Sequence, residues 1–356
     1  MSFERSNIQA MTGYASGEQP DSIDVIKLNT NENPFPPGPG VAAALAAIQV
    51  ENLRRYPPPT ATRLRGLIAT HHNIEAENVI VTNGGDELLR LAVTTFVEAH
   101  ESIAVAEPSY SLYEVLANAH GCGISSIALS PDWTLPDDFA AQLNRSGAKL
   151  CFVVNPHAPS GRLTPVARLR RLAAEFRGVL VLDEAYVDFV DPAQDYNSLP
   201  LMKEFENLLI LRTFSKGYSL AGLRIAYGIG ARSLIDPIQF KTKDSYNTDF
   251  IAQTLACAAL EDIDYAAQTW AYVRQQRSIL ARQLAELGLT SIPSESNFLL
   301  VTVPQPRQAE NIYRELKARG VLVRYFNDPR LDDKLRISIG TAEENQKFIS
   351  ALEDIL

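Results

Sequence analysis

The sequence predicts an α/β protein: a large domain with a mainly parallel central sheet flanked by helices, followed by a smaller α/β domain. Three observations lead to this prediction. Four short apolar runs indicate strands buried on both faces, and each ends in polar or aromatic residues. Helical segments lie between these runs, as expected for parallel strands joined by crossover connections. From about residue 252 the chain changes to long helices and then to a shorter alternation of strands and helices.

Composition narrows the classes of function. The 356 residues include 46% hydrophobic and 21% charged residues, which is typical of a globular protein with a large core. The net charge of −9 argues against nucleic-acid binding, because phosphate backbones are bound by concentrated Lys and Arg. No apolar stretch approaches the ~18 residues of a membrane span, and no signal peptide is apparent. We therefore predict a cytoplasmic protein that binds neither nucleic acid nor membrane.

The cysteines do not suggest a metal or a disulfide framework. Cys122, Cys151 and Cys257 are an odd number and lack the spacing of metal ligands. Cys151 and Cys257 lie in apolar runs, where a free cysteine behaves as a small core residue. No metal site is predicted.

The first forty residues are predicted to form an irregular arm, residues 1–40, that joins the smaller domain. Its segment Val25–Pro34 is dense in Asn and Pro, which disfavour regular structure and supply side chains for turns or for a ligand. Tyr56 follows in a proline-stiffened loop, Arg54-Arg-Tyr-Pro-Pro-Pro59. Helices are predicted on either side of that loop, over Val41–Gln49 and Thr62–Ala69.

A candidate phosphate site comes next. A short strand over Asn78–Asn83 runs into Gly84-Gly85-Asp86-Glu87 and then into a helix that ends near Phe96. Amide groups at the start of a helix can hold a phosphate, and glycines allow its close approach. A plain N-cap role for Asp86 is an equal alternative at this point.

The residues that follow the four apolar strands are the candidates for catalysis. Because the carboxyl ends of parallel strands meet at one edge of a sheet, the residues that follow each strand should converge there. These residues include Tyr110, Asn155, Asp183 with Tyr186, and the lysine loop Thr213–Arg224. The strands are predicted over Ser102–Ala106, Lys149–Val154, Val179–Leu182 and Leu208–Leu211, within a large domain of residues 41–250.

Lys216 is the candidate catalytic residue. A lysine at this edge is suited to covalent chemistry, provided that burial or an attached ring lowers its pKa from about 10.4. Ser215 and Arg224 supply a hydroxyl and a fixed cation, which suit the phosphate of a lysine-bound cofactor. Pyridoxal phosphate is the cofactor that this combination indicates.

Two further strand ends fit the same cofactor. Its ring nitrogen stays protonated only beside a carboxylate, and Asp183 ends an apolar strand. Tyr186 and Asn155 could contact the ring hydroxyl oxygen. Singly, each of these residues is more often a cap, a turn or a core residue. Taken together, they favour the cofactor site.

The smaller domain is predicted over residues 251–356. Its predicted elements are helices over Leu255–Leu260 and Ala266–Leu287 and strands over Phe298–Val301, Val321–Arg324 and Leu335–Ser338. Arg324 and Arg336 lie in these strands among apolar residues, and an Arg in that setting usually meets an anion. Either the anion is a substrate, or the arginines form ion pairs with Asp332 or Asp333.

These motifs resemble the fold-type I pyridoxal-phosphate aminotransferases over nearly the whole chain. The resemblance is carried by Asn155-Pro with Ser160-Gly161, Asp183-Glu-Ala-Tyr186, Ser215-Lys216 and Gly222-Leu-Arg224. A second set is similar to the histidinol-phosphate aminotransferases: Tyr14, Leu28–Pro34, Arg55-Tyr-Pro57, Asn83–Glu87 and Leu335–Gly340. The segment Asp244-Ser-Tyr-Asn247 departs from the Pro-Tyr-Asn usual there, and Gly85 from a more usual Ser or Ala.

The resemblance implies roles for individual residues. It implies an exchange of an amino group between histidinol phosphate and 2-oxoglutarate, in a homodimer with shared sites. Lys216, Asp183 and Tyr186 would be catalytic, and Tyr14, Asn155, Arg324 and Arg336 would bind the substrate. The cofactor would be bound by Gly85, Asp86, Tyr110, Asn155, Asp183, Tyr186, Ser215, Lys216 and Arg224, with Tyr56 contributed by the neighbouring subunit.

Other functions fit parts of the sequence. Close relatives use aromatic amino acids or decarboxylate threonine phosphate on almost the same framework. A non-catalytic amine sensor could keep the fold, although it would have little reason to retain Lys216 and Asp183. A nucleotide-binding dehydrogenase would need Gly-x-Gly-x-x-Gly after a strand, and the sequence lacks that run.

Overall fold

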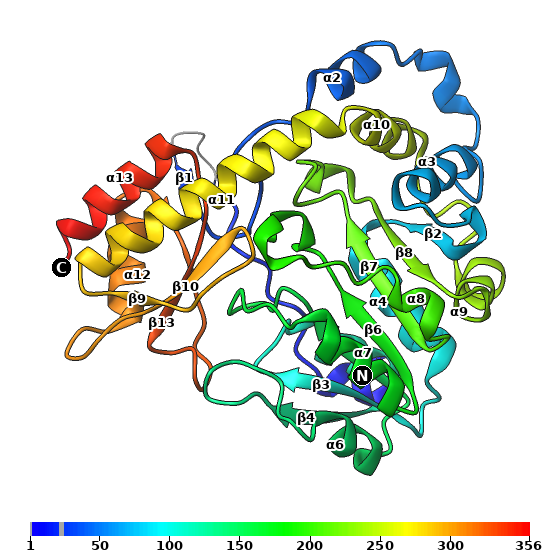
Figure 1. The fold of residues 1–356 in the computed structure, drawn as a ribbon, viewed down its shortest axis with the longest axis horizontal. Helices are drawn as coiled ribbons and strands as arrows, with labels where there is room; N and C mark the ends of the chain where they lie inside the picture. The colour runs from blue at the N-terminus through cyan, green and yellow to red at the C-terminus, as the bar shows by residue number, and fades with distance from the viewer. Residues whose placement is uncertain (1, 21–24) are drawn as a thin grey trace.

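The computed structural model describes residues 2–20 and 25–356, and a seven-stranded sheet forms its centre (Figure 1). The strands lie in the order β2-β8-β7-β6-β5-β3-β4. All run in the same direction except β8, which is antiparallel to both β2 and β7. The α/β prediction with a mainly parallel sheet is confirmed. The bounds are β2 Val79–Thr82, β3 Ser102–Glu107, β4 Gly123–Ala128, β5 Leu150–Val154, β6 Val179–Asp183, β7 Leu208–Thr213 and β8 Ala226–Gly230.

Helices cover both faces of this sheet. Because side chains alternate along a strand, Leu180 and Leu182 of β6 pack into one apolar cluster and Val181 into the opposite one. The first face is covered by α3 Thr62–His72, α6 Phe139–Ser146, α7 Val166–Glu175, α8 Leu201–Glu204 and α10 Phe250–Glu261. The second face is covered by α4 Gly84–Phe96, α5 Leu112–His120 and α9 Arg232–Pro237. Cys151 and Cys257 are buried in the first cluster, as predicted.

A smaller antiparallel sheet lies beside the first, with the order β12-β13-β10-β9. It packs against three helices through one apolar cluster, which contains Leu280 of α11, Leu316 of α12 and Phe348 of α13. The bounds are α11 Ile263–Glu286, β9 Thr290–Ser291, β10 Phe298–Thr302, α12 Ala309–Ala318, β12 Arg324–Tyr325, β13 Lys334–Ser338 and α13 Ala342–Glu353. The strand predicted over Val321–Arg324 is two short strands, β11 Val321–Leu322 and β12.

The N-terminal arm contacts both parts of the molecule. Helix α1, Ser6–Ala10, lies against α5, where Asn7 Nδ2 donates to the Asn118 carbonyl oxygen at 2.8 Å. Strand β1, Ile26–Lys27, then pairs in parallel with β11. The arm therefore crosses from the large sheet to the smaller one, and it passes the edge where the central strands end.

Helix α11 is the longest connection between the two sheets (Figure 1). The helix before it, α10, packs against α3 and α2, Pro39–Ala46, beside the large sheet. The division between residues 250 and 251 stays a prediction, and these contacts favour a boundary after α10. The fold also contains short 3₁₀ helices at Val50–Arg54, Ala76–Asn78, Val187–Phe189, Pro192–Gln194 and Ala221–Leu223, and a π-helix at Ile238–Thr242. Within the described residues, no helix combines the length and the apolar character that a bilayer crossing requires.

Candidate active site

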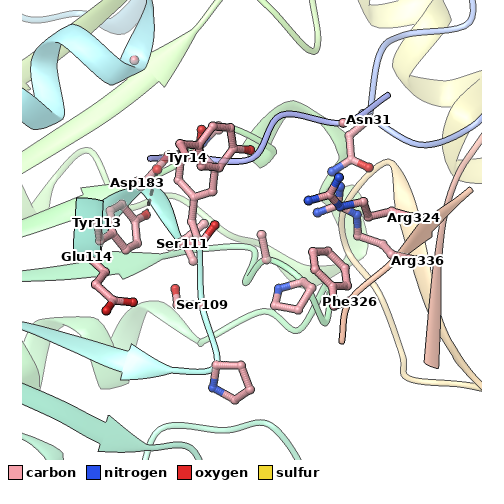
Figure 2. Close-up of a pocket in the computed structure, with 18 of the residues that line it drawn as sticks. Tyr14, Asn31, Ser109, Ser111, Tyr113, Glu114, Asp183, Arg324, Phe326 and Arg336 are labelled. Atoms are coloured by element: carbon pink, nitrogen blue, oxygen red, sulfur yellow. Dashed lines mark hydrogen bonds between the residues drawn. The ribbon is translucent and has the colours of Figure 1, made fainter. Parts of the chain in front are cut away.

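A cavity of about 710 Å³ opens at the carboxyl ends of the central strands, between the two sheets and the arm (Figure 2). Most of the residues predicted for the site line it, although they come from distant parts of the chain. They are Tyr14, Gly85, Asp86, Tyr110, Asp183, Tyr186, Ser215, Lys216, Arg224, Arg324 and Arg336. Asn155 and Tyr56 are not among the lining residues.

Lys216 follows β7, and its amine lies inside the cavity. The Nζ atom donates a hydrogen bond to the carbonyl oxygen of Thr30, 2.8 Å away in the arm. Burial, with the positive charge of Arg336 as the next cause, lowers the pKa of Lys216 to about 8. A large fraction of this amine is thus neutral near pH 8, which is the form that a nucleophile or a proton carrier needs.

Asp183 ends β6 and is buried, with 4% of its surface exposed. Its carboxylate accepts hydrogen bonds from the Tyr113 hydroxyl at 2.9 Å and from the Ala185 amide at 3.1 Å. Burial raises the pKa of Asp183 to about 6. Among the described residues, no basic side chain forms an ion pair with Asp183, so a cationic group of a ligand would meet an unneutralised carboxylate.

The phosphate end of the site gathers around the start of α4. The first amides of a helix have no partner within the helix. Gly84 has φ +75° and approaches Arg224 closely: a Cβ atom at Gly84 would lie 2.8 Å from that guanidinium. The Arg224 guanidinium pairs with Asp86 at 3.0 Å. Ser215 Oγ accepts a hydrogen bond from Thr213, which leaves its own proton for a ligand.

The chemistry of these groups fits pyridoxal phosphate. An amine, a buried carboxylate and an anion-binding helix start match the aldehyde, the ring nitrogen and the phosphate of that cofactor, respectively. Tyr110 lines the cavity between these groups and contacts Tyr113 edge-on, with ring centroids 5.5 Å apart. Tyr186 also lines the cavity, and its hydroxyl oxygen accepts a hydrogen bond from Asn31 at 3.1 Å.

Asn155 is positioned differently from the expectation. Its side-chain nitrogen donates to the Thr164 carbonyl oxygen at 3.1 Å and to the Tyr196 hydroxyl at 2.9 Å. Its side-chain oxygen accepts from the Thr164 amide at 2.7 Å. Both amide protons are used within the protein, because the loop after β5 folds back onto this residue. A contact of Asn155 with the cofactor or substrate stays a prediction.

Tyr56 lies outside the cavity of its own chain. Its side chain is 81% exposed, and its ring stacks on Tyr246 with centroids 4.3 Å apart. Tyr246 belongs to the segment that departs from the family pattern. The predicted contact of Tyr56 with the cofactor therefore requires a second subunit and stays a prediction.

The substrate side of the cavity is rich in positive charge. The guanidinium of Arg336 lies 5.2 Å from the Phe298 ring and 5.3 Å from the Phe326 ring. It donates to the Asn29 carbonyl oxygen at 3.2 Å, whereas its buried Nε has no partner among the described residues. Arg324 donates to the carbonyl oxygens of two arm residues, each at 3.3 Å.

The alternative of internal ion pairs for these arginines is wrong for the described residues. Asp333 pairs with Lys334 instead, and neither Arg324 nor Arg336 forms a salt bridge within residues 2–20 and 25–356. Tyr14 lies on the other side of the cavity, near Asp183 and Tyr113 in Figure 2, with its ring edge-on to Tyr110 at 5.6 Å. The side chains of Figure 2 accordingly form an acidic and aromatic wall opposite a cationic one.

Three residues that contribute to the site were not predicted from the sequence. Tyr113 lies one helical turn after Tyr110, and that spacing is the signal that could have revealed it. Asn31 lies within the arm motif but was not singled out. Arg330 donates to the carbonyl oxygens of Leu129 and Ser130 at 2.8 and 2.9 Å, which joins the loop after β12 to the large domain. No pattern in the sequence indicates that last contact.

Comparison with known proteins agrees with this geometry. The family model for aminotransferase class I and II matches residues 23–352. The chain is 42% identical over 355 residues to histidinol-phosphate aminotransferase 1 of Trichormus variabilis, covering 99% of each. It is 40% identical over 352 residues to the histidinol-phosphate aminotransferase of Geotalea daltonii, again covering 99% of each.

Solved structures share the fold. Histidinol-phosphate aminotransferase from Sinorhizobium meliloti, in complex with pyridoxal-5′-phosphate, superposes with a TM-score of 0.90 at 24% identity, covering 100% of this chain and 99% of that one. L-threonine-O-3-phosphate decarboxylase from Porphyromonas gingivalis gives 0.80 at 22% identity, covering 93% and 99%. Two different activities therefore occur on closely similar backbones, and the choice between them depends on side chains.

Proposed function

The chain belongs to the aminotransferase class I and II family, and we propose that it transfers the amino group of histidinol phosphate to 2-oxoglutarate with pyridoxal phosphate as its cofactor. The observation that carries this proposal is the cationic wall beside Lys216. Arg336 has no anionic partner among the described residues, and Arg324 faces the same cavity. Relatives that are 40 to 42% identical over nearly the full chain carry the name of this activity.

Each residue of the site has a separate role in the proposed reaction. Bound pyridoxal phosphate supplies a ring that accepts electrons from the carbon that loses its proton. Lys216 provides the amine that removes and returns a proton at the substrate Cα, and its lowered pKa makes the neutral form available. Asp183 holds a positive charge at the ring nitrogen. The start of α4, Ser215 and Arg224 hold the phosphate.

Substrate recognition depends on local charge. Histidinol phosphate carries a phosphate and 2-oxoglutarate carries two carboxylates, whereas the protein as a whole has a net charge of −9. Local cations must therefore attract both substrates. The planar guanidinium of Arg336, which lies over the rings of Phe298 and Phe326, can make paired hydrogen bonds to either kind of anion.

The test is a comparison of donors with the cofactor-loaded enzyme and 2-oxoglutarate. We expect kcat/KM to be highest for histidinol phosphate, above phenylalanine and threonine phosphate, and Lys216→Ala to abolish turnover of all three. A higher value for phenylalanine would favour the aromatic alternative. Release of CO2 from threonine phosphate would favour the decarboxylase. A protein that binds the cofactor and turns over no donor would be an amine sensor.

We propose further that the enzyme is a cytoplasmic homodimer in which Tyr56 completes the site of the partner subunit. The exposed position of Tyr56 outside its own cavity supports this arrangement. In a two-fold dimer each subunit lends the same residue to the other. Mixing inactive Lys216→Ala chains with Tyr56→Ala chains should restore activity, because one site of each heterodimer is intact. Absence of recovery after verified subunit exchange would show that Tyr56 is not shared.

A further inference from the structure

Three consecutive residues of the arm contact three functional groups of the cavity. The Asn29 carbonyl oxygen accepts from Arg336 at 3.2 Å, and the Thr30 carbonyl oxygen accepts from Lys216 at 2.8 Å. The Asn31 side chain donates to the Tyr186 hydroxyl at 3.1 Å. Any residue could supply the first two contacts, because they use backbone carbonyls. The third depends on the identity of the side chain.

Asn31 is held on all sides. It is 1% exposed and has φ +57°, in the left-handed region that Asn tolerates better than most residues. Its amide N–H donates to Ser338 Oγ at 2.8 Å, and the Ser338 hydroxyl donates in turn to Asn31 Oδ1 at 3.0 Å. Its carbonyl oxygen accepts from Asn297 at 2.8 Å. The pairing with Ser338 fixes the side-chain oxygen on one side, so the Nδ2 group must face Tyr186.

This orientation has a consequence for the phenol. A carboxamide NH2 group has protons to donate and no acceptor. The Tyr186 proton therefore cannot point at Asn31, and the Tyr186 oxygen can only accept there. Tyr186 lines the cavity on its other side and packs edge-on against Phe298, with centroids 5.1 Å apart. The direction left for its hydroxyl proton is the cavity.

We infer that Asn31 is a positioning residue that directs the Tyr186 hydroxyl proton into the cavity, toward the hydroxyl oxygen of the bound cofactor ring. A phenol that donates to this oxygen stabilises it as an anion and thereby favours the deprotonated form of the cofactor–Lys216 linkage. Asn31 thus acts on the cofactor through Tyr186.

Asn31 also links Tyr186 to the strand that carries Arg336. Ser338 lies two positions after Arg336 on β13, so both side chains project from the same face of that strand. Figure 2 shows Asn31 beside Arg336 and Arg324. Through Ser338 and Asn31, the strand that carries the anion-binding arginine is connected to the phenol.

The test uses Asn31→Gly and Asn31→Asp, because Gly and Asp both accept the positive φ. The measurement is the pH titration of the visible absorbance of the cofactor bound to Lys216, without substrate. We expect the apparent pKa of this band to rise by about 0.5 to 1 in Asn31→Gly, the size of one lost hydrogen bond. Asn31→Asp should raise it further, because its carboxylate accepts the Tyr186 proton. Asn73→Asp, also left-handed at φ +52° but exposed, is the matched control and should leave the pKa unchanged.

A double-mutant cycle separates this role from a merely structural one. In a Tyr186→Phe background, Asn31→Gly should cause no further change in the apparent pKa. Either an unchanged pKa in the single variants or an equal rise without the Tyr186 hydroxyl would overturn the inference. The inference rests on the proposed function only through the cofactor. Failure of histidinol phosphate as a donor would leave the titration readable, whereas absence of the absorbance band would refute the proposed function itself.

Discussion

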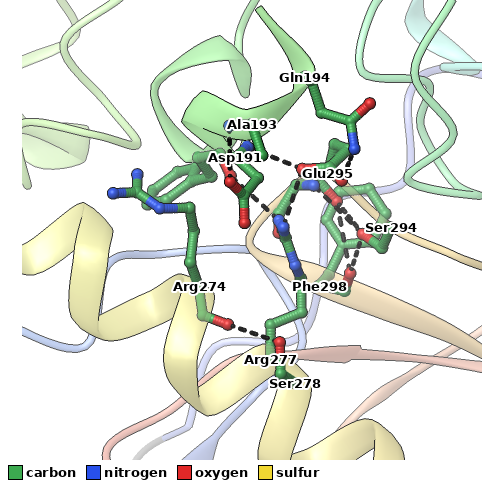
Figure 3. A network of polar contacts seen from close by, with 11 residues as sticks. Asp191, Ala193, Gln194, Arg274, Arg277, Ser278, Ser294, Glu295 and Phe298 are labelled. Atoms are coloured by element: carbon green, nitrogen blue, oxygen red, sulfur yellow. Dashed lines mark hydrogen bonds and ion pairs between the residues drawn. The ribbon is translucent and has the colours of Figure 1, made fainter.

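Arg277 and Arg336 are both largely shielded from solvent, and they differ in whether a carboxylate lies beside the guanidinium. Arg277 of α11 is 7% exposed and donates to the carbonyl oxygens of Phe189 and Ser296 at 3.1 and 2.8 Å. It also pairs with Glu295 at 2.9 Å, and the same carboxylate accepts from the Asp191 amide (Figure 3). Its charge is neutralised within the protein.

Arg336 lacks such a partner. It packs over two aromatic rings, makes one hydrogen bond to a carbonyl oxygen and meets no carboxylate among the described residues. Asp183, on the opposite wall, is a buried carboxylate with no cationic partner in the described part of the chain. A buried charge that the protein itself neutralises has a structural role. A buried charge without a partner in the protein is expected to bind an oppositely charged ligand. We therefore expect substitution of the balanced arginine to lower stability, and substitution of the unbalanced arginine to lower catalytic efficiency.

The largest effect should come from the balanced pair. Arg277→Ala leaves Glu295 without its cation and removes two bonds to carbonyl oxygens, so we expect the free energy of unfolding to fall by about 3 to 5 kcal/mol. Denaturant unfolding of the cofactor-free protein measures this change, and kcat/KM per folded molecule should stay near wild type. Arg274→Ala is the matched control: Arg274 lies about one turn earlier on α11, and its side chain points away from Glu295 in Figure 3, where only its backbone carbonyl is bonded. Equal losses for both variants would refute the distinction.

Asp183 extends the comparison to a carboxylate. Its folded pKa of about 6 lies above the usual 3.8, so the folded protein binds more protons between these values than the unfolded chain does. The stability that this contributes is complete below pH 4 and is lost as pH rises through 6, by up to about 3 kcal/mol. The free energies of unfolding of cofactor-free wild type and Asp183→Asn, compared across pH 4 to 7, measure this loss of stability. Parallel pH curves for the two proteins would contradict the prediction.

The smallest effect should come from the unbalanced arginine, and it should appear in kinetics. Arg336→Ala is expected to lower kcat/KM for donor and acceptor by roughly 10- to 150-fold, equivalent to about 1.5 to 3 kcal/mol. The free energy of unfolding should not fall, because Arg336 forms no ion pair within residues 2–20 and 25–356. Arg324→Ala should affect the phosphorylated donor more than phenylalanine. A large loss of stability in Arg336→Ala would place that residue in the same class as Arg277.

The sequence allowed five of the seven central strands to be predicted, since continuous apolar runs mark strands buried on both faces, and most of the predicted site residues line the cavity. Strands β4 and β8 were missed: β8 carries two glycines in five residues, and β4 is mostly exposed or half-buried. The strand-end residues converged because topology brings them together. The pairing of Asn155 with Thr164 and of Asn31 with Ser338 could not be foreseen, because each depends on the exact path of a loop. In the second case the partners are 307 residues apart.

The parallel pairing of Ile26–Lys27 with Val321–Leu322 has a consequence for biosynthesis. The arm leaves the ribosome first, but its partner strand lies near the end of the chain and is made roughly 15 to 60 s later at usual rates of translation. The large sheet can fold in that interval, because all of its strands precede residue 231. Until the last strands emerge, Asn29, Thr30 and Asn31 cannot be held beside Arg336, Lys216 and Tyr186. A nascent chain stalled before β11 would therefore carry a folded sheet with an incomplete catalytic centre, so that enzymatic competence arises only once translation is nearly finished.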